Sequence, residues 1–351
     1  MAFPLTNKRR WRILRFYCIG WTLAFVFLSI VRGVGTTEMG SLKFDTTSSL
    51  LISVTLGPIM GLISGIGQIL TEERVQQYRS LISLLIFRFI YGVVFLALLI
   101  LGAYAVYQLY FGTTLDLVAF AIDDGSAAIY FYVLSVDVFL TLLRQINLML
   151  GEGNLRKLMQ GKFYTPREEE RIFMFLDLSS STQLAEQLGH LNYSLLIQDC
   201  FNDLGNALAN NSAEIYQYVG DEAVLTWTLK NGLKNDSCLK AFYDFKSTLE
   251  KKRGYYEKKY GVLPFFKAGM HTGMVTVTEV GKYKKEIAYH GDTLNTAARI
   301  QEQCNSLGSE LLISETLVNL FNSSTYSFAA LGSISLKGKE EKVVLFAVSQ
   351  I

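Results

Sequence analysis

Two aspartates occupy positions from which they can bind a metal ion together. Asp177 comes near the end of the apolar run Ile172–Leu178, which is typical of a buried central strand. Asp221 lies in a tight turn between Ala213–Val219 and Ala223–Thr228, which predict a β-hairpin. If the hairpin pairs beside the first strand, the two carboxylates form an oxygen-rich site of the kind that Mg²⁺ binds with substrate phosphates. Taken alone, each residue favours the simpler explanation, in which Asp177 is a helix cap and Asp221 is a turn residue.

The segment after Asp177 is suited to phosphate groups. Leu178–Thr182 opens a predicted helix, where backbone N–H groups can face a polyphosphate. Its hydroxyl side chains belong to Ser179, Ser180, Ser181 and Thr182.

Asn295 and Arg299 form a second pair, on the predicted helix Thr293–Gln303. Their spacing of four residues places both side chains on one helix face. The spacing permits joint action on a substrate, although a lone helical arginine is ordinarily a surface charge.

Four short motifs and a closing segment occur in order along the second half of the chain. They are Phe175-x-Asp177-x4-Thr182, Val219-Gly220-Asp221-Glu222-Ala223, Lys267-Ala268-Gly269-Met270-His271-x-Gly273, Gly291-Asp292-x-x-Asn295-x-Ala297-Ala298-Arg299 and Leu336-Lys337-Gly338-x6-Leu345-Phe346-x-Val348. Together they resemble the class III adenylate/guanylate cyclase catalytic domain. The resemblance covers Arg171–Ile351 and implies an α+β, ferredoxin-like (palm) domain.

The resemblance implies a metal-dependent reaction. Asp177 and Asp221, with the carbonyl of Leu178, would bind two divalent cations, Mg²⁺ or Mn²⁺. One cation would activate the ribose 3′-hydroxyl of a nucleoside triphosphate and the other would bind its phosphates. The expected products are the 3′,5′-cyclic nucleotide and pyrophosphate.

The resemblance also implies a site shared by two chains. Asn295 and Arg299 would orient the ribose and stabilise charge at the α-phosphate, while Lys267 and Lys337 would hold the β- and γ-phosphates. In this family the site lies between two domains. We therefore expect a homodimer, in which Asn295, Arg299 and Lys337 complete the metal site of the other chain.

The base-reading positions depart from the family pattern. Gln217 and Ala288 stand where a Lys and an Asp or Thr usually read adenine, and the guanine-reading Glu/Cys pair is also absent. An amide can donate to adenine or accept from guanine. We expect ATP, because an amide donor in place of an ammonium donor is the smaller change. The alternatives are a guanylate cyclase, and a membrane receptor whose cyclase-like domain binds nucleotide without turnover.

The composition separates the chain into two halves. Of its 351 residues 50% are hydrophobic and 18% are charged, with a net charge of +2. Residues 1–150 hold 11 Lys and Arg and 8 Asp and Glu, whereas residues 151–351 hold 22 and 23. This fits a membrane half joined to a water-soluble half. The near-neutral charge, without a basic stripe, argues against nucleic acid as a partner.

Four stretches reach the ~20 apolar residues that a helix needs to cross a bilayer. They are Trp11–Val34, Ser48–Leu70, Leu81–Tyr110 and Ala127–Leu150. Basic residues lie before the first stretch, between the second and third (Arg74 and Arg79), and after the fourth (Arg156 and Lys157). This pattern predicts a four-helix transmembrane region in the cell membrane, with both ends and the catalytic domain in the cytoplasm.

Some features of the membrane half leave alternatives open. The small-residue repeat Gly57, Gly61 and Gly65 allows close helix contact, either within one chain or with a second copy. Asp137 lies in mid-span, where it is either a structural hydrogen-bonding residue or part of a ligand or ion sensor. Arg88 and Arg144 are expected to extend toward the cytoplasmic surface.

Three regions follow from these patterns. Residues 1–150 are the predicted transmembrane domain, 151–170 a linker or transmission element, and 171–351 the catalytic domain. The other predicted helices are Asn154–Gln160, Leu184–Gly189, Tyr193–Asn210 and Cys238–Tyr260, and the other predicted strands are Phe265–His271, Met274–Val280, Leu311–Ile313, Tyr326–Leu331, Ile334–Leu336 and Val343–Val348.

Overall fold

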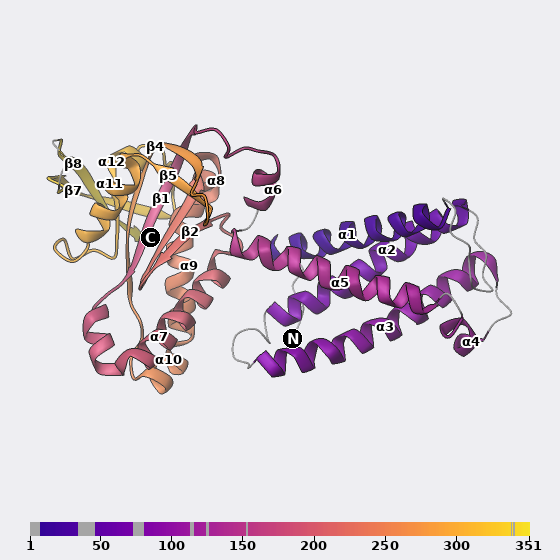
Figure 1. Cartoon of the computed structure of the whole chain (residues 1–351). Coiled ribbons are helices and arrows are strands. Elements are labelled where there is room, and N and C mark those ends of the chain that lie inside the picture. Colours follow the sequence, from indigo (N-terminus) through magenta and orange to yellow (C-terminus); the bar gives the residue numbers. More distant parts are fainter. Residues whose placement is uncertain are drawn as a thin grey trace. The chain divides into compact units, whose positions relative to one another are not determined.

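The computed structural model of the chain describes residues 8–33, 46–72, 81–112, 116–123, 126–151, 154–337, 339 and 341–351. The chain divides into two compact units, Met1–Leu148 and Met149–Ile351, called here the N-terminal and the C-terminal unit. The N-terminal unit is helical in its described part, whereas the C-terminal unit combines a sheet with helices (Figure 1).

Four long apolar helices form the N-terminal unit, as the sequence predicts. They are α1 (Lys8–Gly33), α2 (Thr46–Leu70), α3 (Leu81–Phe111) and α5 (Ser126–Met149). Each is long and apolar enough to cross a membrane. The short helix α4 (Leu117–Ala121) was not predicted; its first turn is capped by Asp116, whose side chain accepts from the backbone N–H of Ala119.

The glycine repeat of α2 packs against α1 of the same chain. A Cβ atom added at Gly57 would lie 2.6 Å from Cα of Thr22, and one added at Gly61 would lie 2.4 Å from Cα of Cys18. Side chains at these positions would separate the two backbones. Of the two alternatives left by the sequence, the described residues therefore support the contact within one chain.

The prediction for Arg144 is wrong. Its side chain is 5% exposed, and its Nε and Nη2 donate to the carboxylate of Glu72 at 2.9 and 3.1 Å. Arg9 donates to the same carboxylate at 2.8 Å. The sequence analysis missed this contact because the second predicted stretch ends at Leu70, and Glu72, which lies just after it, was not considered. Arg74, Arg79 and the side chain of Arg88 lie outside the described residues.

One mixed sheet organises the C-terminal unit. Its strands are β1 (Arg167–Leu178), β2 (Glu214–Val219), β3 (Glu222–Thr228), β4 (Phe266–Val280), β5 (Glu286–His290), β6 (Leu311–Ser314), β7 (Tyr326–Ile334) and β8 (Val343–Gln350). They lie in the order β2-β3-β1-β4-β6-β8-β7, and β5 pairs with β4. The predicted hairpin does pair beside the first strand, because β3 and β4 flank β1.

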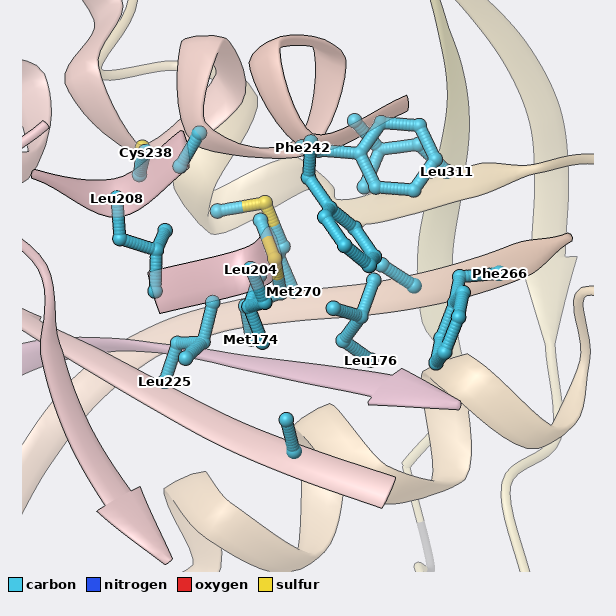
Figure 2. Packing of buried hydrophobic residues seen from close by; sticks show 14 of the residues in the cluster. Met174, Leu176, Leu204, Leu208, Leu225, Cys238, Phe242, Phe266, Met270 and Leu311 are labelled. Atoms are coloured by element: carbon cyan, nitrogen blue, oxygen red, sulfur yellow. The ribbon is translucent and has the colours of Figure 1, made fainter. Parts of the chain in front are cut away.

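Alternation along β1 divides the core between two faces. Met174 and Leu176 point to the face covered by α7 (Ser181–Leu208) and α9 (Ser237–Lys251), where Leu204 and Phe242 meet them (Figure 2). Phe173 belongs to a cluster on the other face that includes Ala297 of α11 (Asp292–Glu302). Asp177 is four residues after Phe173 on β1, so its side chain points to the same face of the sheet, the one covered by α11.

Several predicted boundaries differ from the observed ones. The predicted strands Phe265–His271 and Met274–Val280 are one strand, β4, because both halves continue the same pairing with β1. The helix predicted over Cys238–Tyr260 is divided into α9 and α10 (Arg253–Tyr260). The remaining short helices are α6 (Asn154–Met159), α8 (Leu229–Leu233) and α12 (Glu315–Val318).

Gly269 sets the distance between β4 and α11. A Cβ atom added there would lie 2.1 Å from the backbone nitrogen of Gln301 and 2.8 Å from the carbonyl oxygen of Ala297. Both contacts are with backbone, which cannot move aside as a flexible side chain can. The helix therefore lies directly on the strand at this residue.

Replacing Gly269 by alanine should destabilise the C-terminal unit by about 2 kcal/mol, because α11 must move away from β4. The full-length protein carrying Cys18→Ala allows a direct measurement, since the other three cysteines (Cys200, Cys238 and Cys304) are buried in this unit. Their labelling by a thiol-reactive dye during heating reports its unfolding. The control is Gly205→Ala on α7, where an added Cβ would have no described atom within 4 Å apart from the neighbouring backbone of its own helix. Equal midpoints for the two variants would contradict the close approach.

Candidate active site

Three charged residues form a row across neighbouring strands. Glu222 of β3 pairs with Asp177 of β1, which pairs in turn with Lys267 of β4. Residues paired across strands point to the same face of a sheet. The row therefore lies on the α11 face and places two acids directly opposite one another.

Asp221 adds a third carboxylate at the turn between β2 and β3. Burial and the nearby charge of Asp221 raise the pKa of Asp177 to about 6. Burial, followed by the charges of Asp177 and Asp221, raises the pKa of Glu222 to about 7. The two predicted metal-binding aspartates are thus close enough to repel each other, and Glu222 belongs to the same cluster.

α11 and the segment after it contact this row. Gln301 donates from Nε2 to Oδ2 of Asp177 at 3.2 Å. Lys267 donates from Nζ to Oδ1 of Asn305 at 2.6 Å. Gln301 lies on α11 and Asn305 lies in the segment after it. This part of the chain therefore orients the acidic end of β1.

The predicted phosphate segment has an unusual backbone. Ser180 precedes α7 with φ 58° and ψ 32°, a left-handed conformation that is uncommon outside glycine. The N–H of Ser179 already donates to the carbonyl of Phe265 at 2.8 Å, which leaves the amides of Ser180, Ser181 and Thr182 as the candidates for a phosphate. The Ser179 hydroxyl is buried without a hydrogen-bond partner among the described residues.

Tyr193 of α7 lies beside the acids. Burial and the charge of Asp221 raise the pKa of its phenol, which also interacts with Ser181. Sequence reasoning missed Tyr193, Glu222 and Gln301. Glu222 stands within a quoted motif, but its role depends on the strand register, and Tyr193 reaches the site through a change of direction at Gly189, where φ is 71° and ψ is 161°.

Asn295 and Arg299 lie on the side of α11 that is not packed against the sheet. Asn295 is exposed and Arg299 is partly exposed, whereas Thr296 and Ala297 between them are buried. At the start of the helix Asp292 forms an ion pair with Lys339 at 2.7 Å. This hydrogen-bonded pairing lowers the pKa of Asp292, and Arg299 contributes to the same effect. The segment after exposed Lys337 is thereby tied to the helix that carries Asn295 and Arg299.

The predicted site residues therefore fall into two groups within one chain. The first group surrounds the end of β1 and contains Asp177, Leu178, Asp221, the Ser179–Thr182 segment and Lys267. The second contains Asn295, Arg299 and Lys337. Neither group includes the base-reading positions, since Gln217 lies exposed on β2 and Ala288 lies on β5, paired with Thr278.

The first group has the chemistry of a divalent-cation site. Its carboxylates repel one another, and a cation placed between them would relieve that repulsion. Within the described ranges no three His, Cys, Asp or Glu side chains are arranged as a complete metal site. A cation here would therefore also use the Leu178 carbonyl, water or substrate oxygens, as Mg²⁺ commonly does.

Comparison with known proteins agrees with this architecture. The sheet with α7 and α9 on one face and α11 on the other is a nucleotidyl cyclase fold. Residues 163–350 match the family described as the adenylate and guanylate cyclase catalytic domain. The match spans more than half of the chain, and the chain belongs to this family.

Individual relatives are more distant. The chain is 30% identical over 219 residues to adenylate cyclase 2 of Rhizobium meliloti (strain 1021), which covers 62% of this chain and 60% of that protein. It is 24% identical over 185 residues to an adenylate cyclase of Anabaena cylindrica, covering 50% of this chain and 36% of that protein. The structure of a bacterial light-regulated adenylyl cyclase superposes with a TM-score of 0.53 at 20% identity, over 61% of this chain and 63% of that chain. This structural likeness concerns the fold.

Glu222→Gln should stabilise the metal-free protein at about pH 8. Folded Asp177 and Glu222 retain protons that the unfolded chain releases near pH 4, so their contribution to stability falls as the pH rises from about 4 through about 7. Removing one acid lowers the remaining repulsion. Scanning calorimetry in EDTA should show a midpoint raised by a few degrees and a flatter pH dependence.

Glu186→Gln is the matched control for Glu222→Gln, because Glu186 is an exposed glutamate of α7. Its pH profile should follow that of the wild-type protein. If Glu222→Gln followed the same profile, the carboxylate repulsion inferred here would be wrong.

Proposed function

We propose that this protein is a membrane-bound adenylate cyclase that converts ATP to 3′,5′-cyclic AMP and pyrophosphate. The observation that carries the proposal is the pair Asp177 and Asp221, brought together at the end of a central strand in a domain of the cyclase family. Two relatives carry the name adenylate cyclase. Attack of the ribose 3′-oxygen on the α-phosphorus forms one P–O bond and breaks the bond to pyrophosphate, and the hydroxyl proton leaves to solvent.

Asp177, Asp221 and the carbonyl of Leu178 would hold two divalent cations, Mg²⁺ or Mn²⁺. When bound, such cations make a hydroxyl more acidic and offset charge on a triphosphate. The protein contributes a half-buried acidic pair whose repulsion favours cation binding, with Gln301 orienting Asp177.

We place the complete site between two copies of the chain. Within one chain, burial and the charge of Asp221 raise the pKa of Asp177, and the hydrogen bond from Gln301 lowers it. Arg299, in contrast, contributes to the lowered pKa of Asp292. The face of α11 that carries Asn295 and Arg299 is directed away from the sheet of its own chain, which suits contact with a second cyclase domain. A symmetric pair would contain two equivalent sites, each with acids from one chain and the amide and guanidinium groups from the other.

The remaining residues take the roles that the family resemblance implies, and each role suits the chemistry of its side chain. Asn295 would orient the ribose, and Arg299 would stabilise the charge that develops at the α-phosphate. Lys267 and Lys337 would bind the β- and γ-phosphates. The backbone amides of Ser180, Ser181 and Thr182 at the start of α7 would face the phosphate chain.

ATP is preferred over GTP on the basis of Gln217, whose exposed amide can donate to adenine. Ala288 provides no polar side chain, so backbone groups would complete base recognition. Guanylate cyclase activity is the second candidate, because the same amide can accept from guanine. A silent nucleotide-binding receptor is the third, although such a receptor would not need the acids, Asn295 and Arg299 together.

The four apolar helices would place the protein in the cell membrane, with the catalytic domain in the cytoplasm. This orientation rests on the basic residues that flank the helices in the sequence. The linker around α6 would transmit the state of the helices to the catalytic domain. Lys157 of α6 contacts Glu214 of β2 at 3.4 Å, and Glu214 in turn accepts from Arg171 of β1 at 2.9 Å.

The direct test is a product assay on the purified full-length protein with Mn²⁺ or Mg²⁺ and either ATP or GTP. ATP should give cyclic AMP and pyrophosphate at a higher kcat/KM than GTP gives cyclic GMP. Asp177→Ala and Asp221→Ala should each reduce the rate to below about 1% of wild type, because the cations lose a ligand. Nucleotide binding without pyrophosphate release would contradict the enzymatic proposal, and faster turnover of GTP would contradict the base preference.

Mixing two inactive variants tests the shared site. Asp177→Ala chains and Arg299→Ala chains should each be inactive alone. Random pairing of equal amounts gives mixed dimers that keep one intact site, so about a quarter of wild-type activity should return. Verified mixed dimers without any recovery would contradict the two-chain site while leaving cyclase activity itself to the product assay.

A further inference from the structure

Asp292 begins a stripe of polar residues along one face of α11. Asp292, Asn295 and Arg299 follow one another at intervals of three and four residues, which places their side chains one above the other on the helix. Ala297 and Ile300 lie on the buried side of the same helix. The charge of Arg299 contributes to the lowered pKa of Asp292, so the two ends of the stripe interact. Asp292 therefore shares a helix face with the two groups proposed to act at the ribose and the α-phosphate.

The segment that carries Lys337 is fixed on both sides of this residue. Leu336 is 1% exposed and belongs to one buried cluster with Ile300 of α11. The backbone N–H of Lys339 donates to the carbonyl of Leu336 at 3.0 Å, which closes a turn around Lys337. Nζ of Lys339 lies 2.7 Å from Oδ2 of Asp292. Lys337 itself is exposed, and it is held between a residue buried beside α11 and a residue paired with the first turn of that helix.

The groups around Asp292 favour its pairing with Lys339. Thr296 donates from Oγ1 to Oδ2 of Asp292 at 3.1 Å and so helps to orient the carboxylate. His271 of β4 lies nearby and shares a hydrogen bond of 2.7 Å with Ser314. Burial, followed by the charge of Lys339, lowers the pKa of His271 to about 4. The imidazole is therefore neutral at pH 7 and does not compete with Lys339 as a cation.

We propose that Asp292 and Lys339 are positioning residues of the proposed active site. Their ion pair holds Lys337 on the helix face that carries Asn295 and Arg299, and thereby strengthens binding of the β- and γ-phosphates. This inference rests on the proposed function, in which Lys337 binds those phosphates. A cationic segment that is ordered before the substrate arrives loses less conformational entropy on binding. Because the Asp292 side chain is 61% exposed, the ion pair should add little to the stability of the fold.

The test is steady-state kinetics of the full-length protein in lipid nanodiscs, with inhibition by each product. Asp292→Asn keeps an acceptor for Thr296 but loses the charge, and Lys339→Met loses the ammonium group. Each should raise the KM for ATP and the inhibition constant of pyrophosphate about tenfold, because a charged contact to these phosphates is no longer preorganised. The inhibition constant of cyclic AMP, which lacks the β- and γ-phosphates, should stay unchanged.

Two further variants separate the ion pair from its individual side chains. The double variant Asp292→Asn/Lys339→Met should have the same constants as either single variant, because one interaction is lost in all three. Lys339→Arg keeps the cation and should retain the wild-type inhibition constant of pyrophosphate.

Arg253 and Glu257 provide a matched control. They form an exposed ion pair on α10 at 3.1 Å and belong to neither group of site residues. Arg253→Met and Glu257→Gln should keep the wild-type KM and both inhibition constants. Thermal unfolding should give midpoints close to wild type for Asp292→Asn and Lys339→Met.

Three results would overturn the positioning role. Folded, active Asp292→Asn could bind pyrophosphate as tightly as the wild type, the constants for pyrophosphate and cyclic AMP could rise together, or the effects of the two single variants could add. A wild-type protein that forms no product would contradict the proposed function instead. Binding of the α,β-methylene analogue of ATP, which cannot release pyrophosphate, then tests the ion pair directly, with the same tenfold loss expected.

Discussion

Repulsion among carboxylates at the end of β1 is the constraint on which the proposed chemistry depends. Asp177 and Glu222 face each other across two strands, and Asp221 lies close to both. Like charges held this closely oppose folding, so the surrounding structure must keep them in place. The large apolar core on the α7 and α9 face of the sheet supplies that stability, and the resulting acidic site favours a cation.

The same strand joins three parts of the C-terminal unit. Its start is fixed by Arg171, a fully buried side chain that pairs with Glu169 and Glu214. Through Glu214 it is connected to Lys157 of α6, in the segment predicted as the linker. Its other end carries Asp177. A displacement of α6 can therefore reach the acids through a continuous strand, which gives the proposed transmission a physical route.

α11 connects the two groups of site residues while keeping them apart. One side lies against β4 at Gly269 and sends Gln301 to Asp177. The opposite side presents Asn295 and Arg299. A single rigid helix thus orients the acids of its own chain and carries the groups proposed for the partner's site. Precise positioning of this kind is what catalysis by electrostatic stabilisation requires.

The sequence alone determined the four apolar helices, the hairpin and the cyclase-like order of motifs, because hydrophobic periodicity and short motifs are local properties of the chain. That the hairpin pairs beside β1 was only a condition at that point, and the sheet register decided it. It did not determine the cluster around Asp177, since Glu222, Tyr193 and Gln301 meet there only through strand register, a bend in α7 and packing of α11. The prediction for Arg144 was wrong for the same reason: its partner Glu72 is 72 residues away in the sequence. Long-range contacts of this kind depend on how elements pack, and the tertiary structure alone decides them.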